Sequence, residues 1–168
     1  MAEPARLERA MFAAGCFWEA EAAFRRIDGV VETVVGYAGG TLPDPDYGQV
    51  STGTTGHVEV VGVVFDPARI PYWELLDIFW QIHDPSREDG QGDFTGPQYR
   101  SVIFYYDKSQ KETAVASRDR LAASEKSGDR PVITEIMPAP VFWPAEECHQ
   151  QFYEKCALGY CTSRQIYE

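Results

Sequence analysis

Six periodic segments follow one another in the order β-α-β-β-α-β along the first two thirds of the chain. Two of them, residues 16–27 and 70–84, repeat apolar side chains at the three- and four-residue spacing of a helix. The strand-like segments are apolar and mostly β-branched or aromatic, at residues 9–15, 29–40, 57–67 and 99–107. This order is that of the split β-α-β, or ferredoxin-like, fold. The sequence therefore predicts a two-layer α+β fold, with a mixed sheet and helices on one face.

The rest of the chain extends this pattern. An amphipathic helix is expected over 108–128 and a strand over 132–139, followed by a tail that becomes irregular after Cys156. The helix within 70–84 is expected to begin near Pro71, and its apolar stripe comprises Trp73, Leu76, Phe79 and Trp80. We expect one catalytic domain over 1–168, with an N-terminal extension at 1–9 and a mobile tail at 157–168.

Two polar segments, 41–56 and 84–98, lack any period. Each has about 15 residues, and loops of that length inside a compact domain are uncommon unless they are functional. We therefore expect both loops to contribute side chains to a site.

The charge balance excludes one class of partner. The chain has 15 basic and 26 acidic residues and a formal net charge of −11, which opposes binding to nucleic acid. No run approaches the ~18 apolar residues of a membrane helix. The N-terminal residues lack the pattern of a cleavable signal peptide. We expect a cytoplasmic protein, and a monomer by default.

The pentapeptide GCFWE, at residues 15–19, places a single cysteine where the first strand meets the first helix. The N–H groups of a helix's first turn lack intrahelical partners, and together with the helix dipole they favour an anion such as a thiolate. We therefore expect a lowered pKa and a nucleophilic sulfur at Cys16, with Gly15 allowing close approach of the backbone to a ligand. The alternative is that Cys16 is a small buried side chain at a helix start.

Phe17 and Trp18 follow this cysteine directly. Adjacent helical positions lie about 100° apart, so we expect the two rings not to face the same core. One of them then lines a pocket near Cys16, where aromatic faces suit a methyl group bonded to sulfur. The alternative is that both rings are ordinary core side chains.

Several segments in this chain resemble, in the same order, those of one enzyme family. They are GCFWE, GVVETVVGYAGG, PDYGQVSTGTTGHVEVVGVVFDP, HDP, QYRSVIFYY and CHQQFYEKCALGYC. The family is that of the peptide methionine sulfoxide reductases of the A type. The resemblance implies reduction of the S epimer of methionine sulfoxide, free or protein-bound, and so repair of oxidised proteins. It also implies a Cys16 sulfenic acid, an intramolecular disulfide, recycling by thioredoxin or another dithiol, and no metal or organic cofactor.

The reaction needs an acid to protonate the sulfoxide oxygen. Glu59 follows the first long loop and lies among β-branched residues, where desolvation raises the pKa of a carboxyl. The strand pattern leaves open that Glu59 faces outward, but the resemblance places the catalytic glutamate of the family in the matching GHVE segment. The resemblance also assigns Tyr47 and Tyr99, one beside each long loop, to binding the oxygen.

The second long loop departs from the family pattern. The family reads QGND-x-G-T-QYR, and this chain reads QGDFTGPQYR, so Asp93 lies one place early and Phe94 occupies the usual position of an aspartate. That aspartate contacts the substrate backbone in the family. We retain Asp93 as a candidate binding residue with two alternatives: either it makes this contact after a small adjustment of the loop, or the contact is lost in this chain. His57 and His83 are expected to be structural.

The late cysteines divide into three expectations. The resemblance assigns Cys161, in GYC, as the resolving cysteine that attacks the Cys16 sulfenic acid. Cys156 replaces a residue that is usually Asn in the family, and it is a candidate second recycling thiol. Cys148 is expected to be a plain, partly buried thiol.

Three other readings of these residues stay open. Cys148, His149, Cys156 and Cys161 are zinc-compatible, although their spacing lacks a CxxC knuckle. A thiol peroxidase or hydrolase would also use an activated Cys16. A binding module without chemistry is the third alternative.

Overall fold

The computed structural model describes residue 4 and residues 6–124 and 129–157. The strands are β1 (Glu8–Ala14), β2 (Val30–Ala38), β3 (Val58–Phe65), β4 (Gly90–Gln91), β5 (Phe94–Thr95), β6 (Ser101–Tyr105), β7 (Glu135–Pro138) and β8 (Trp143–Pro144). The α-helices are α1 (Phe17–Arg25), α2 (Tyr47–Ser51), α3 (Tyr72–Gln81), α4 (Lys108–Ala122) and α5 (Phe152–Ala157). Two 3-10 helices, η1 (Pro97–Tyr99) and η3 (Glu147–His149), complete the described elements.

The main sheet has six strands in the order β7-β6-β1-β3-β2-β8. Neighbouring strands among the four central ones are antiparallel, and their order is that of a ferredoxin-like fold. Strand β7 joins one edge in parallel to β6, and β8 joins the other edge antiparallel to β2, so the sheet is mixed. The predicted α+β class with a mixed sheet is confirmed.

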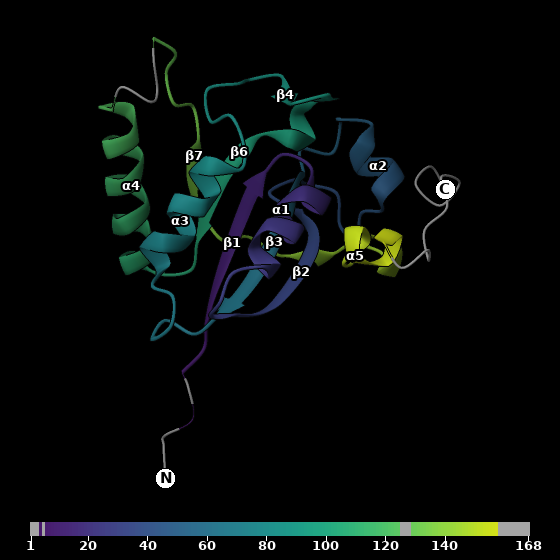
Figure 1. Cartoon of the computed structure of the whole chain (residues 1–168). Coiled ribbons are helices and arrows are strands. Elements are labelled where there is room, and N and C mark those ends of the chain that lie inside the picture. The colour runs from purple at the N-terminus through teal and green to yellow at the C-terminus, as the bar shows by residue number, and fades with distance from the viewer. Residues whose placement is uncertain (1–3, 5, 125–128, 158–168) are drawn as a thin grey trace.

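The predicted layer arrangement is also confirmed. Helices α1 and α3 contact each other and β1, and α4 packs beside α3 against β6 and β7 (Figure 1). The core between helices and sheet stacks Phe12 of β1 against Phe24 of α1 and Phe79 of α3, with ring centroids 5.2 and 5.4 Å apart. The opposite face of the sheet holds a smaller cluster, and Ala139 and Phe142 pack against it.

The first long loop contains a short helix that sequence periodicity does not predict. Helix α2 occupies residues 47–51 within the segment expected to be irregular. Asp46 accepts a hydrogen bond from the Gln49 N–H at 2.7 Å, and the Gln49 side chain accepts one from the Asp46 N–H at 3.0 Å. This capping box stabilises a helix too short to form by periodicity alone, so the loop prediction for these five residues is wrong.

Other boundaries also differ from expectation. The second loop folds into the β4–β5 hairpin and η1, so Tyr99 lies in η1 and not in a strand. Helix α3 begins after Pro71 as predicted, but Trp73 is 52% exposed because the helix buries Leu75 instead. Strand β1 already includes Glu8, which lies within the predicted extension 1–9. In the ranges that the structure describes, no helix is long and apolar enough to cross a membrane.

Candidate active site

Cys16 lies between β1 and α1 and is the N-cap residue of that helix. Its carbonyl accepts the first helical hydrogen bond from the Ala20 N–H at 3.2 Å. The side chain is 2% exposed and belongs to the main core cluster. The predicted position at the strand–helix junction is confirmed, and the sulfur faces a dry interior.

Gly15 allows a close approach, but the neighbour is part of the protein. Its φ of +86° lies in the left-handed region that favours glycine, and an added Cβ would lie 2.7 Å from Cβ and Cγ of Gln91. The Gln91 amide in turn holds the backbone N–H and carbonyl of Asp84, each at 2.7 Å. Gly15 thus lets the second loop pack directly beside Cys16.

Glu59 approaches the same helix start from the sheet. It lies on the helix-facing side of β3, it is 2% exposed, and its Oε1 accepts a hydrogen bond from the Phe17 N–H at 3.1 Å. Burial raises the pKa of Glu59 to about 8, and the Phe17 N–H opposes this shift only in part. The expectation of a desolvated carboxyl is therefore confirmed, the raised pKa favours its protonated form, and the outward-facing alternative is wrong.

The pKa of Cys16 departs from expectation. Burial is the main cause that raises it to about 12, and the charge that Glu59 carries when ionised is a second contribution to the same shift. The N–H groups of Trp18 and Glu19 lower it, as the helix-start argument requires, but desolvation is the larger effect. The prediction of a lowered pKa for Cys16 is wrong, because it considered the helix terminus and not the burial of the side chain. A protonated acid beside a protonated thiol is the resting arrangement at neutral pH.

An aromatic cluster surrounds Cys16 on the helix side. The rings of Phe17 and Trp18 lie 6.3 Å apart, and Tyr47 stacks on both with centroid distances of 6.4 and 6.1 Å. Phe152 of α5 stacks on Trp18 at 4.0 Å. Both rings of the Phe17–Trp18 pair are thus buried, at 1% and 7% exposure. The expectation that Phe17 and Trp18 do not face the same core is wrong, because Tyr47 of α2 and Phe152 of α5 cover the ring of Trp18.

The two candidate tyrosines reach this centre from the two long loops. Tyr47 is the first residue of α2 and is half-buried. Tyr99 ends η1, which packs against β3, and is 8% exposed. Burial raises the pKa of Tyr99, and the nearby Glu59, Tyr47 and Cys16 add to this effect. The structure therefore gathers Cys16, Glu59, Tyr47 and Tyr99 in one place.

Three further groups at the site escaped the sequence reasoning. His149 is 3% exposed and its Nδ1 accepts a hydrogen bond from Trp18 Nε1 at 3.1 Å. Tyr37 lies directly opposite Glu59 in the β2–β3 register. Its hydroxyl donates to Glu146 Oε1 at 3.0 Å. No periodicity marks these residues, because strand register and the path of the 139–149 segment bring them to the site.

Asp93 does not join this group. It is exposed and lies at the turn between β4 and β5, whereas its neighbour Phe94 turns inward, with its ring 5.3 Å from that of Tyr99. The register of the hairpin thus gives the inward position to the side chain that occupies the aspartate's place in the family pattern. A contact between Asp93 and a bound substrate stays a prediction.

The late cysteines lie in different surroundings. Cys156 is on α5, which docks on α1 through an ion pair between Glu154 and Arg25 with a 2.6 Å contact. Cys156 packs partly buried against the core cluster that contains Cys16. Cys148 is exposed, so the expectation of a partly buried thiol is wrong. Cys161 lies outside the described residues.

The histidines outside this centre are structural, as predicted. His57 Nδ1 accepts the Gly40 N–H at 3.0 Å, and its Nε2 contacts the Leu42 carbonyl at 2.7 Å. Among residues 4, 6–124 and 129–157, no three His, Cys, Asp or Glu side chains form a group that could hold a metal ion.

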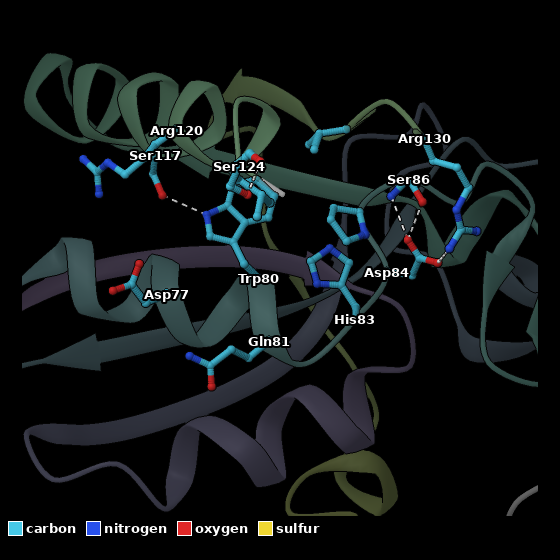
Figure 2. A pocket seen from close by; sticks show the side chains of 13 residues that line it. Asp77, Trp80, Gln81, His83, Asp84, Ser86, Ser117, Arg120, Ser124 and Arg130 are labelled. Atoms are coloured by element: carbon cyan, nitrogen blue, oxygen red, sulfur yellow. Dashed lines mark hydrogen bonds and ion pairs between the residues drawn. The ribbon is translucent and has the colours of Figure 1, made fainter. Parts of the chain in front are cut away.

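A separate cavity of about 700 Å³ lies between α3, α4 and the segments that follow them (Figure 2). Some of its polar side chains are paired with one another: Trp80 donates to Ser117, and Asp84 accepts from Ser86 and contacts Arg130. No residue of the Cys16 centre lines it.

Known proteins share this sequence and fold over nearly the whole chain. The sequence model of the family described as peptide methionine sulfoxide reductase matches residues 8–167. A curated relative from Methanoculleus marisnigri, a peptide methionine sulfoxide reductase MsrA, is 52% identical over 97% of this chain and 99% of its own. The solved methionine sulfoxide reductase A of Corynebacterium diphtheriae superimposes with a TM-score of 0.86 at 37% identity, covering 96% of this chain and 80% of its own.

A further solved structure shows a relative with a partner. Mxr1 from Saccharomyces cerevisiae in complex with Trx2 superimposes with a TM-score of 0.63 at 27% identity, covering 88% of this chain and 86% of its own. The matches in sequence and structure agree with the geometry around Cys16. The chain therefore belongs to the peptide methionine sulfoxide reductase family, of the A type, and is an oxidoreductase.

Proposed function

We propose that this protein reduces the S epimer of methionine sulfoxide through a sulfenic acid on Cys16. The observation that carries the proposal is the Glu59 carboxyl, buried against the first-turn N–H of the helix that begins after Cys16, with a pKa of about 8. A carboxyl in that state holds a proton at neutral pH and can donate it to an oxygen beside the thiol.

In the first step, Glu59 and Cys16 supply all the protons that are transferred, and no outside acid or base is needed. Glu59 donates its proton to the sulfoxide oxygen, which makes the sulfur electrophilic, and Cys16 attacks that sulfur. The thiol proton of Cys16 passes to the Glu59 carboxylate, which is again protonated. The S–S bond of the resulting adduct then breaks as the oxygen passes from the substrate sulfur to the Cys16 sulfur, which gives a sulfenic acid and releases methionine, with the two electrons supplied by the thiol sulfur. The raised pKa of Cys16 is compatible with this order. The Glu59 carboxylate, which takes the thiol proton, forms only after Glu59 has protonated the sulfoxide oxygen.

The surrounding groups have distinct roles in the proposal. Phe17 and Trp18 bind the methyl group on sulfur, and Tyr47 and Tyr99 hydrogen-bond the developing oxygen charge. Gly15 lets Gln91 complete the wall beside the thiol, and Asp93 contacts the substrate backbone if the hairpin turns inward. Burial of the aromatic rings next to Cys16 supports the first role.

Recycling requires a second thiol. Cys161 attacks the Cys16 sulfenic acid to form a disulfide and release water, and a thioredoxin or another dithiol then reduces that disulfide. The complex of the yeast relative with Trx2 supports a thioredoxin as the partner. Cys156 is a candidate for passing the disulfide outward, since α5 holds it near the core that contains Cys16.

The proposal also covers the substrates, the cofactors and the cellular setting. The substrates are free methionine sulfoxide and oxidised proteins, and no metal or organic cofactor takes part. We propose a monomeric protein of the cytoplasm that acts as one catalytic domain, with residues 157–168 as the tail that carries Cys161. The acidic net charge of −11 supports the expectation that nucleic acid is not a partner.

Counting methionine released per enzyme tests the scheme. With thioredoxin as reductant, Cys16→Ser is expected to release none. Cys161→Ser is expected to release about one equivalent and then stop, because the sulfenic acid has no resolving thiol. Cys148→Ser, at an exposed position, is the matched control and should turn over normally. Sustained release by Cys16→Ser would overturn the scheme, and peptide mapping of the oxidised enzyme assigns the disulfide partner.

A further inference from the structure

Glu146 connects two elements of the site that are far apart in sequence. It lies between β8 and η3, and its side chain is 43% exposed. Its Oε1 accepts a hydrogen bond from the Tyr37 hydroxyl at 3.0 Å. Its Oε2 accepts one from the Tyr47 N–H at 3.0 Å. One carboxylate therefore joins strand β2 to the start of α2.

The strand end of this connection is buried in the sheet. Tyr37 is fully buried, and it pairs with Glu59 across the β2–β3 ladder on the face that the helices cover. Its ring lies 5.7 Å from that of Phe17. Tyr37 thus presents a fixed hydroxyl donor beside the acid of the reaction, and Glu146 accepts from it.

The helix end of the connection has less support from its own element. Tyr47 begins a helix of five residues inside a segment that is otherwise irregular. The N–H groups of a helix's first turn have no intrahelical acceptor, so Tyr47 N–H needs one from elsewhere. A carboxylate is the stronger kind of acceptor, because hydrogen bonds to a charged group are shorter and stronger than neutral ones.

We propose that Glu146 is a positioning residue, which holds the Tyr47 ring and hydroxyl over Phe17 and Trp18 by fixing the first residue of α2 to Tyr37. The inference rests on the proposed role of Tyr47 in binding the sulfoxide oxygen. Displacing a catalytic contact by about 1 Å can cost about a hundredfold in rate. Glu146 therefore acts on the rate of the reducing step through Tyr47, without touching the substrate.

The test is a double-mutant cycle between Glu146 and the Tyr47 hydroxyl, measured as the single-turnover rate of methionine formation. Glu146→Ala is expected to lower this rate about 10- to 100-fold, with a smaller change in substrate affinity. In a Tyr47→Phe background the same change should cost less than about 2-fold, because the hydroxyl to be positioned is absent. Glu146→Gln keeps one acceptor oxygen and should restore part of the rate.

Two further variants separate positioning from folding. Tyr37→Phe removes only the hydroxyl at the strand end, and it is expected to reproduce part of the Glu146→Ala loss. Glu147→Ala is the matched control, since the adjacent glutamate has a side chain that is 91% exposed and contacts Lys155. It should change the rate by less than about 2-fold. Thermal unfolding of each variant shows whether the protein is folded at the assay temperature.

Each outcome supports or overturns the inference. Equal losses for Glu146→Ala in the wild-type and Tyr47→Phe backgrounds would show that Glu146 acts on the fold or on another group, and would overturn it. A rate unchanged by Glu146→Ala would do the same while leaving the proposed function intact. A rate unchanged by Tyr47→Phe would instead refute the role of Tyr47, and with it this inference. A smaller loss of rate for Glu146→Ala in the Tyr47→Phe background than in the wild type supports both the role of Tyr47 and this inference.

Discussion

Two regions of this molecule hold a desolvated titratable side chain, the buried Glu59 and the partly buried His83, and desolvation shifts their pKa values in opposite directions. Glu59 beside Cys16 has its pKa raised to about 8, which brings the titration of a carboxyl into the neutral range. His83, at the cavity between α3 and α4 (Figure 2), has its pKa lowered to about 4 by burial, which removes its titration from that range. Desolvation disfavours the charged form in both cases.

The hydrogen bonds of the two groups explain the contrast further. His83 Nδ1 contacts the Phe79 carbonyl at 2.6 Å, and this acceptor requires the proton to be on Nδ1. Nε2 then accepts from the Ser101 hydroxyl at 2.7 Å, so both ring nitrogens are engaged. Glu59 instead accepts one N–H bond at Oε1. The comparison teaches that a shifted pKa marks chemistry only when it moves towards the working pH and beside a reactive group.

The largest expected effect comes from removing the acid at Glu59. Glu59→Gln keeps an oxygen that can accept the Phe17 N–H but cannot donate a proton to the sulfoxide oxygen. We expect the single-turnover rate of methionine formation to fall about 10²- to 10⁴-fold, the usual contribution of a general acid. In the wild-type protein the rate should fall as pH rises through about 8, because Glu59 loses its proton there. A rate that stayed constant up to pH 9 would contradict the role of Glu59.

The same substitution is expected to stabilise the fold at neutral pH. The folded-state pKa of Glu59, about 8, lies above the ordinary value of 4.5, so the folded protein retains a proton that the unfolded chain releases between these values. Stability of the wild type therefore falls over this range by about 1.4 kcal/mol per pH unit, and Glu59→Gln removes that loss. Urea unfolding of both proteins at pH 5 and pH 8 measures the difference.

A second glutamate provides the opposite control. A hydrogen bond from Arg25 lowers the pKa of Glu154, so its contribution to stability is present above the ordinary pKa and lost as pH falls. Glu154→Gln should therefore give no gain at pH 8. A gain of equal size for both substitutions would show that the effect of Glu59 reflects net charge and not burial.

The smallest expected effect on activity comes from substituting His83. His83→Phe removes the hydrogen-bond partner of the Phe79 carbonyl, whereas the Ser101 hydroxyl keeps its 2.7 Å contact with the Thr134 hydroxyl, and the loss is expected to cost about 1–3 kcal/mol of folding free energy. The rate of methionine formation in the folded variant should change by less than about 2-fold. Thermal unfolding followed by assay below the midpoint checks this. A tenfold loss of rate in the fully folded His83→Phe variant would show that the region around His83 also contributes to the reaction.

Much of the fold and part of the site were predictable from local pattern. The β-α-β-β-α-β order follows from short-range periodicity, and so does the position of Cys16 at a strand–helix junction. The identity of Glu59 as a desolvated carboxyl was suggested by its β-branched neighbours, although strand alternation left its direction open. Helix α2 was missed because a capping box, and not an apolar stripe, stabilises its five residues.

Local sequence pattern determined the central β-α-β-β-α-β elements and their order, and together with the family resemblance it pointed to Cys16 and Glu59 as the residues of the proposed chemistry. Tertiary structure determined the electrostatics: burial of Cys16 in the core outweighs the helix terminus and raises the pKa of Cys16 instead of lowering it. It also brought Tyr37, Glu146 and His149 to the site through strand register and chain path. The physical reason is that desolvation depends on everything packed around a group, whereas periodicity reports only its neighbours along the chain.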